Sequence, residues 1–450
     1  MAREMALGSR LRAARLTLSP AQSIVAGFAA VILVGAGLLS LPIASETGQP
    51  TPFLTALFTA NSAVCVTGLV VVDTADHYST FGELVILALI QIGGFGYMTS
   101  WALLALVLGW RIGLRERIVL TQAHNLYEVG GVVRFTRRIV LMALTIEAVG
   151  ALILTLRWSV DAPLGRAAYL GLFHSVSAFN NAGFDVMGGF RSLTAYVSDP
   201  LVSLTIAALI ILGGLGFSVL FDLLSRRLTT HSKTVLLGSG ILIAAGAGLF
   251  LLLEFANPET LGGLSPAARA LAAVFQAVTP RTAGFHTLNL GALTQPTLAL
   301  IVALMFIGAS PGGTGGGIKT TTFIAPLAVI LSTIRGTGDA TLFRRRIPVF
   351  VIYKAVTIAL VSVAFVMTMT VLLTRVEGTD FLPALFEVTS AFGTVGLSTG
   401  LTPDLSQAGR VIVMLTMFGG RVGLLTLAFG VTRRVRPPRI RYPEDRIYVG

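Results

Sequence analysis

The sequence predicts an all-α membrane protein made of four helix–pore helix–helix repeats, arranged with pseudo-fourfold symmetry around one pore. Three observations predict this fold. Of the 450 residues, 54% are hydrophobic and only 12% are charged, which is too little charge to cover a soluble protein of this size. Eight apolar segments are long enough to span a bilayer. A shorter apolar segment that ends in a small polar stretch with one glycine occurs four times.

The eight spanning segments each contain about 20 residues or more, as the hydrocarbon core of a bilayer requires. They are residues 21–43, 81–108, 137–157, 199–224, 234–255, 296–331, 348–374 and 408–431. Between the members of each pair lies a half-length segment, at residues 52–63, 166–179, 266–278 and 382–392. A helix of about eleven residues reaches only about 16 Å. We therefore expect these four segments to enter the membrane and turn back, buried within protein.

The four glycines that follow the half-length segments define the repeats. Gly68, Gly183, Gly284 and Gly396 are 115, 101 and 112 residues apart, which indicates an internal repeat of about 110 residues. We place the repeats at 1–110, 111–232, 233–335 and 336–432, followed by a cytoplasmic tail at 433–450. Because every repeat begins and ends on the same side, the repeats are parallel. A pseudosymmetry axis along the membrane normal is expected.

The basic residues predict the orientation. The chain has 33 Lys and Arg against 21 Asp and Glu, and 23 of the basic residues fall in five clusters between or beyond the spans. The clusters are Arg3 to Arg15, Arg111 to Arg138, Arg226 to Lys233, Arg335 to Arg346, and Arg433 to Arg446. This pattern follows the positive-inside rule and places both termini in the cytoplasm. It indicates contact with anionic membrane lipid or a docked partner, and not with nucleic acid.

The four glycine stretches are typical of an ion selectivity filter. Main-chain carbonyls can replace the water of a dehydrated potassium ion, and glycine allows the backbone conformations that point them at one axis. The predicted ion-binding residues are Val66, Thr67, Gly68, Asn181, Ala182, Gly183, Thr282, Ala283, Gly284, Thr394, Val395 and Gly396. Asp73 and Asp185, slightly further outward, are expected to concentrate cations at the mouth. The alternative is that these glycines only permit close helix packing.

A second glycine element lies in the last span of each repeat and is expanded in the third, from Gly308 to Gly317. Six of these ten residues are glycine, and Pro311 cannot donate a helical hydrogen bond. We expect Gly308–Thr322 to lie across the pore under the filter as a gate. The predicted gate residues are Gly312, Gly313, Thr314, Gly315, Gly316, Gly317, Lys319 and Arg421. The alternatives are a kink that only serves packing, and a salt bridge from Arg421 to Glu147 or Asp222.

Catalytic motifs fit the chain poorly. The stretch from Gly312 to Thr320 lacks the lysine directly after the last glycine that a phosphate-binding loop requires, because Ile318 intervenes. A nucleophilic role for Ser310 would require a general base within hydrogen-bond reach, and the sequence indicates none. The histidines show no metal-ligand spacing. We therefore expect no enzyme activity and no metal except potassium at the filter. A membrane enzyme is a distant alternative.

Several motifs resemble those of the Trk/Ktr/HKT superfamily of potassium transporters. They are Thr67-Gly68-Leu69 with the following Val70 to Asp73, Phe179 to Phe184, Thr279 to Phe285, and Ser310 to Gly313. The length, and the tail after Gly423, are most similar to its KtrB-type membrane subunit. The resemblance covers nearly the whole chain. It implies a homodimer with one pore per subunit, located in the bacterial inner membrane, and a cytosolic ring of nucleotide-binding regulatory subunits of the KtrA type.

The expected function is potassium uptake through the four-glycine filter, gated by the intramembrane loop and controlled by the regulator. Some plant members of the superfamily carry serine at the first filter position and favour sodium, so Gly68 fits potassium. A sodium transporter or a poorly selective cation transporter of the same fold is the alternative. Sodium as a coupling or activating ion is left open by the sequence.

Overall fold

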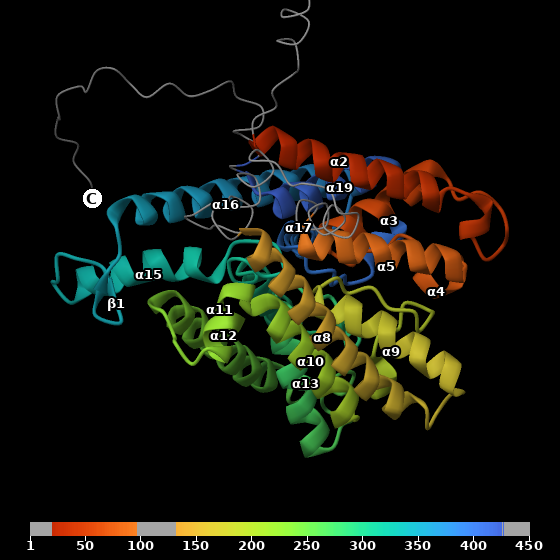
Figure 1. Ribbon diagram of the computed structural model, residues 1–450, viewed down its shortest axis with the longest axis horizontal. Helices are drawn as coiled ribbons and strands as arrows, with labels where there is room; N and C mark the ends of the chain where they lie inside the picture. Colours follow the sequence, from red (N-terminus) through yellow and green to blue (C-terminus); the bar gives the residue numbers. More distant parts are fainter. Residues whose placement is uncertain (1–19, 97–131, 425, 427–450) are drawn as a thin grey trace, which may run out of the picture.

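The protein is mostly helical (Figure 1). The computed structural model describes residues 20–96, 132–424 and 426. The predicted tail at 433–450 and the basic clusters at 3–15 and 433–446 lie outside these residues. In chain order the elements are α2 (Pro20–Leu39), η1 (Pro42–Ala44), α3 (Phe53–Cys65), α4 (Thr74–His77), α5 (Thr80–Phe95), α8 (Val132–Trp158), α9 (Leu164–Phe179), η2 (Thr194–Tyr196), α10 (Pro200–Leu215), α11 (Phe217–Leu224), α12 (Thr230–Glu254), α13 (Pro266–Val278), η3 (Leu290–Ala292), α14 (Gln295–Phe306), α15 (Thr320–Ile334), β1 (Thr341–Leu342), β2 (Arg345–Arg346), α16 (Val349–Glu377), α17 (Phe381–Gly393), α18 (Leu401–Asp404) and α19 (Gln407–Val422).

The first helix of each predicted repeat is a long apolar helix. Within the described residues, α2, α8, α12 and α16 are long and apolar enough to cross a membrane, and the bent pair α10–α11 can count as a fifth span. Their outward faces carry many exposed large hydrophobic side chains, such as Leu141, Leu252 and Val371. Contact of such apolar faces with water would cost free energy, whereas contact with lipid would not.

The second helices are shorter than predicted. The segment 296–331 was expected to cross with a break, and it forms α14 and α15 with residues 307–319 between them. The segment 199–224 was expected to be one span, but α10 and α11 meet at 102° at Gly216. The segments 81–108 and 408–431 begin as α5 and α19 and continue outside the described residues. Hydropathy continues through the bend at Gly216, which is why the segment 199–224 was predicted to be one span.

The four half-length helices are present where the sequence predicts them, as α3, α9, α13 and α17. Ser265 is the N-cap residue of α13, and its hydroxyl accepts from the amide of Ala268 at 3.4 Å. Pro266 takes the first helical position. Asp380 is the residue before α17. The last turn of each helix is buried, so these ends form the centre of the molecule.

The glycine pairs of the second helices pack against these buried ends. A Cβ atom added to Gly93, Gly213 or Gly420 would overlap the carbonyl oxygen of Val64, Phe179 or Phe392, respectively. Each of these carbonyls belongs to the residue four positions before Gly68, Gly183 or Gly396, respectively. The pairs therefore let α5, α10 and α19 pass directly against the last turn of α3, α9 and α17.

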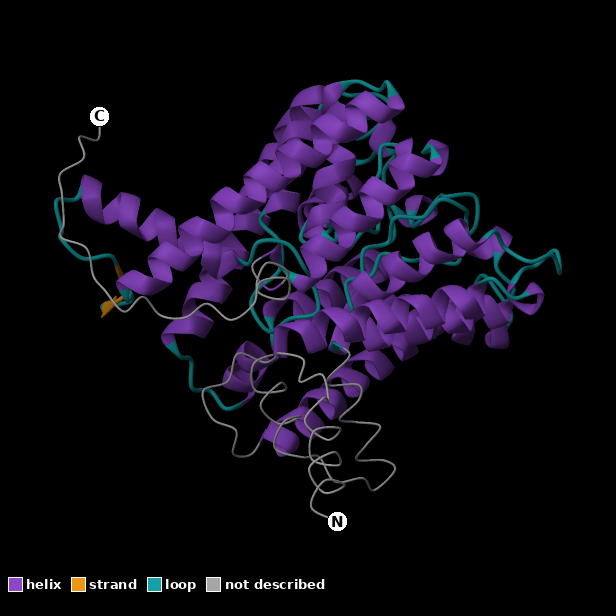
Figure 2. Cartoon of the chain, turned by 90° about the horizontal axis from the view of Figure 1, so that it is seen from above, coloured by secondary structure: helices purple, strands orange, loops and turns teal. Residues whose placement is uncertain are grey.

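The short hairpin of β1 and β2 joins α15 to α16, which run side by side away from the rest of the protein (Figure 2). Arg344, Arg345 and Arg346 in this hairpin are exposed. These three arginines of the basic cluster at 335–346 therefore lie on the surface, at the end of the extension formed by α15 and α16.

Candidate functional site

The four glycine segments share an unusual backbone conformation. The residue two before each glycine has a left-handed backbone, with φ of 57° at Val66, 58° at Asn181, 78° at Thr282 and 50° at Thr394. The glycines have φ of 92° at Gly68, 70° at Gly183, 83° at Gly284 and 94° at Gly396. Positive φ is uncommon outside glycine. Four of the nine such residues in the described chain share this one position, which indicates a functional constraint.

The four segments also meet one another. A Cβ atom on Gly183 would lie 2.7 Å from the carbonyl oxygen of Ala283, and one on Gly284 would lie 2.5 Å from that of Val395. In the same way Gly68 faces the carbonyl oxygen of Ala182, and Gly396 faces that of Thr67. The contacts therefore run from the first segment to the second, third and fourth and back to the first. We call this arrangement the glycine ring.

Hydrogen bonds to the half-length helices orient the segments. The amide of the residue before each glycine donates to a carbonyl in or just after the last turn of the helix. The pairs are Thr67 to Ser62 (2.8 Å), Ala182 to Ser177 (2.8 Å), Ala283 to Thr279 (2.9 Å) and Val395 to Ser390 (2.8 Å). In a trans peptide the carbonyl points opposite to the N–H, so the carbonyls of the left-handed residues point away from the helices. The helix C-termini add negative dipole charge beside the ring.

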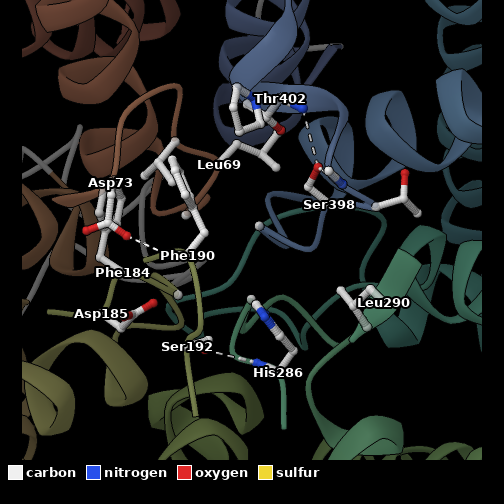
Figure 3. A pocket seen from close by; sticks show the side chains of 18 of the residues that line it. Leu69, Asp73, Phe184, Asp185, Phe190, Ser192, His286, Leu290, Ser398 and Thr402 are labelled. Atoms are coloured by element: carbon white, nitrogen blue, oxygen red, sulfur yellow. Dashed lines mark hydrogen bonds between the residues drawn. The ribbon is translucent and has the colours of Figure 1, made fainter. Parts of the chain in front are cut away.

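Beyond the glycines lies a cavity of about 200 Å³ (Figure 3). It is lined by all four ring glycines and by side chains that include Asp73, Asp185 and His286. Burial raises the pKa of Asp185 to about 6, an effect to which the nearby Asp73 adds and which the Met187 N–H opposes. Burial lowers the pKa of His286 to about 4. At neutral pH the carboxylate is therefore charged and the imidazole is neutral, so the cavity favours cations.

At the other end of the ring lies the glycine-rich loop at 307–319. The Ser310 amide donates to the carbonyl of Gly214 (2.9 Å), and the Thr314 amide donates to that of Gly213 (3.1 Å). The Thr314 hydroxyl donates to the carbonyl of Phe179 (3.1 Å) at the end of α9. The amide of Phe217 donates to the loop carbonyl of Gly312 (3.1 Å). The bend between α10 and α11 therefore receives the loop.

The loop touches the ring segments directly. The amide of Gly316 donates to the hydroxyl of Thr394 at 3.1 Å. A Cβ atom on Gly315 would overlap the hydroxyl of Thr282. Both threonines are the left-handed residues of their segments, two positions before the glycine. The loop thus contacts the segments before the glycines, and the cavity contacts them at and after the glycines.

Two cations hold the loop through main-chain carbonyls. The Lys319 ammonium donates to the carbonyls of Gly315 (2.6 Å) and Gly316 (3.4 Å). Arg421 on α19 donates to the carbonyl of Thr314 in the loop and to that of Gly93 at the end of α5. The structure therefore brings both predicted gate cations to the loop.

The salt bridges considered for Arg421 do not form. The Glu147 carboxylate accepts hydrogen bonds from the amides of Gln91 (3.1 Å) and Asn180 (2.9 Å). Asp222 accepts from the hydroxyls of Thr229 (2.8 Å) and Ser232 (2.6 Å). A sequence does not show which backbone carbonyls are free to accept a hydrogen bond. The sequence could therefore suggest only acidic side chains as partners for Arg421.

Sequence reasoning missed the buried hydroxyls of the half-length helices and one buried carboxylate. Serine stands six residues before the glycine in three segments, at Ser62, Ser177 and Ser390, and that spacing was a usable signal. Glu387, the one acidic residue in the four half-length helices, accepts hydrogen bonds from the hydroxyls of Ser398 and Thr402 beside the cavity.

The apolar helices, and the buried half-length helices between them, define a mostly helical, multi-pass membrane protein. A family model described as TrkH, cation transport protein, matches residues 19–439. The chain is 42% identical to the Ktr system potassium uptake protein B of Bacillus subtilis, over 96% of this chain and 97% of that protein. It is 38% identical to the potassium/sodium uptake protein NtpJ of Enterococcus hirae, over 97% and 98%.

The fold is that of a solved structure. The crystal structure of the potassium transporter TrkH from Vibrio parahaemolyticus matches with a TM-score of 0.70 and 18% identity, over 93% of this chain and 86% of that one. The chain belongs to the TrkH family of cation transport proteins.

Proposed function

We propose that this protein is a potassium uptake transporter of the Ktr/Trk type and that the glycine ring is its selectivity filter. The observation that carries the proposal is the closed ring of four segments with one repeated backbone conformation. It is supported by the relatives named as potassium uptake proteins. Ordered carbonyls bind a dehydrated cation without the deep trap of a full negative charge.

In the same proposal the repeats surround the ring with pseudo-fourfold symmetry, and the loop at 307–319 is a gate below it. The loop's contacts to α9, α10 and α19 support this role, because movement of any of these helices would disturb it. The names of the Ktr system relatives support a complex with a regulatory component, which we propose to be a cytosolic nucleotide-binding ring of the KtrA type. We further propose a homodimer in the bacterial inner membrane, with both termini cytoplasmic.

A second candidate function is transport of sodium, or of sodium together with potassium. It is favoured by the relative named as a potassium/sodium uptake protein. Competition distinguishes the two functions. Excess sodium would inhibit rubidium uptake by a transporter that accepts sodium, and it would leave rubidium uptake unchanged in a transporter selective for potassium. If sodium is instead a coupling or activating ion, it would raise rubidium uptake.

The test of the proposed function is uptake of radioactive rubidium by purified protein in liposomes, with and without the regulatory subunit. Rubidium stands in for potassium because it has a similar size and the same charge. We expect uptake well above that of empty liposomes, inhibited by potassium. Uptake equal to that of empty liposomes under both conditions would overturn the proposal.

A further inference from the structure

Two serines bind the amide nitrogens of ring glycines. The Ser62 hydroxyl accepts from the Gly68 amide at 3.1 Å, and the Ser390 hydroxyl accepts from the Gly396 amide at 3.1 Å. Both serines are fully buried. Because their main-chain carbonyls also accept from the preceding amides, each serine holds two consecutive N–H groups of its segment against the helix.

The other two segments are held differently. The hydroxyl of Ser177 donates to the carbonyl of Phe184 at 2.7 Å, and the hydroxyl of Thr279 donates to the carbonyl of Phe285 at 2.5 Å. Both carbonyls belong to the residue after the ring glycine. Both hydroxyl-bearing residues are fully buried. The same kind of side chain therefore acts as an acceptor in two segments and as a donor, further out, in the other two.

The difference decides which peptide planes can turn. Holding the Gly68 N–H toward α3 fixes the Thr67 carbonyl on the opposite side, because the two groups of a trans peptide point in opposite directions. Ser390 fixes the Val395 carbonyl in the same way. In the part of the chain that the structure describes, no hydroxyl holds the amides of Gly183 and Gly284 like this. The peptides before these two glycines are therefore free of that restraint.

We infer that Ser62 and Ser390 are positioning residues for ion selectivity, which make the first and fourth segments the rigid half of the ring. This inference rests on the proposed function. The two rigid segments are neighbours, since Gly396 faces the Thr67 carbonyl, and the second and third segments form the adaptable half. In this inference, potassium is preferred over sodium because the carbonyls are held apart and do not collapse around the smaller ion. The rigid half supplies that resistance.

The test is the ratio of potassium to sodium uptake, measured by ion competition with rubidium in liposomes. Ser62→Ala and Ser390→Ala each remove one hydrogen bond to a buried amide, and we expect the ratio to fall roughly fivefold to tenfold. Ser177→Ala and Thr279→Val remove only the outer bond, and we expect a change of less than about twofold. Ser203→Ala is the matched control, because Ser203 on α10 is also buried and its hydroxyl donates to the main-chain carbonyl of Tyr196 in η2, at 3.3 Å.

An unchanged ratio in both Ser62→Ala and Ser390→Ala would overturn the inference, as would an equal fall in Ser177→Ala. If the alanine variants fold poorly, binding without transport gives the answer. The rise in the thermal unfolding midpoint with potassium, relative to sodium, should shrink in Ser62→Ala and should persist in the conservative Ser62→Thr. A wild-type protein with no preference for potassium in either assay would instead contradict the proposed function.

Discussion

Two residues of every ring segment have a positive φ, and one of the two is not glycine. A left-handed backbone at Val66 or Thr282 costs free energy, on the order of 1–3 kcal/mol each. The surrounding structure must therefore enforce it. The sequence identified the glycines because they recur at regular spacing. It could not identify the left-handed residue two positions earlier, since valine, asparagine and threonine share no property that predicts this conformation.

The outer cavity should make uptake sensitive to pH through Asp185. Burial raises the pKa of this carboxyl to about 6, so its charge is present above that pH and is lost below it. We expect uptake at low potassium to fall roughly twofold to fivefold when the outside pH changes from about 7.5 to about 5.5. His286, with a pKa near 4, stays neutral over this range.

The matched variant is Asp185→Asn, which should show the low-pH rate at both pH values. Asp161→Asn removes an acidic side chain that does not line the cavity and serves as the control. Identical pH profiles for the wild type and Asp185→Asn would exclude this carboxyl as the titrating group.

Among the elements, the half-length helices were the most predictable and the second helices the least. Length alone separates a segment of 13 residues, such as α13, from a span, and Ser265-Pro266 marks its start. The bend at Gly216 was not predictable, because the apolar pattern continues through it. The break after α14 was predicted from its glycines, but the hydrogen bonds that fix the loop to α10 depend on segments about 100 residues away.

The loop should control flux if it is a gate. Deleting residues 312–316 removes its contacts to α9 and to Arg421, and we expect raised potassium flux that no longer needs a regulator. Thr314→Val removes only the hydrogen bond to Phe179 and should raise flux less. Thr333→Val, which loses an exposed hydroxyl on α15, is the control. Wild-type flux and regulation in a folded deletion variant would show that the loop only serves packing.

For the whole molecule, orientation is a prediction from charge that labelling can test. In a Cys65→Ser background, a cysteine at Arg345 in the β1–β2 hairpin should react with an impermeant thiol reagent only after the membrane is opened. A cysteine at Gln49, exposed between η1 and α3, should react in intact cells. Labelling of a cysteine at position 345 from outside intact cells would contradict the predicted orientation.

The sequence predicts that the four glycine segments surround one axis, but it does not predict which segments touch or through which atoms. Gly68 and Gly396 are 328 residues apart in the sequence, and only the fold brings their segments into contact. The interpretation as a filter assigns the same function to each of the four glycines, although the segments differ in sequence and in how they are held. A shared function predicts that the same substitution weakens ion selectivity at all four glycines.

The most direct test of the proposed filter is the potassium-over-sodium preference of Gly68→Ser, Gly183→Ser, Gly284→Ser and Gly396→Ser. An added Cβ would strike the neighbouring segment at each position, and φ is positive at all four, so the carbonyls must shift. We expect the preference for potassium to fall at least several-fold in every variant. The control is Gly37→Ser, where an added Cβ would meet nothing within 4 Å, and its preference should be unchanged. An unchanged preference in all four folded variants would contradict the account.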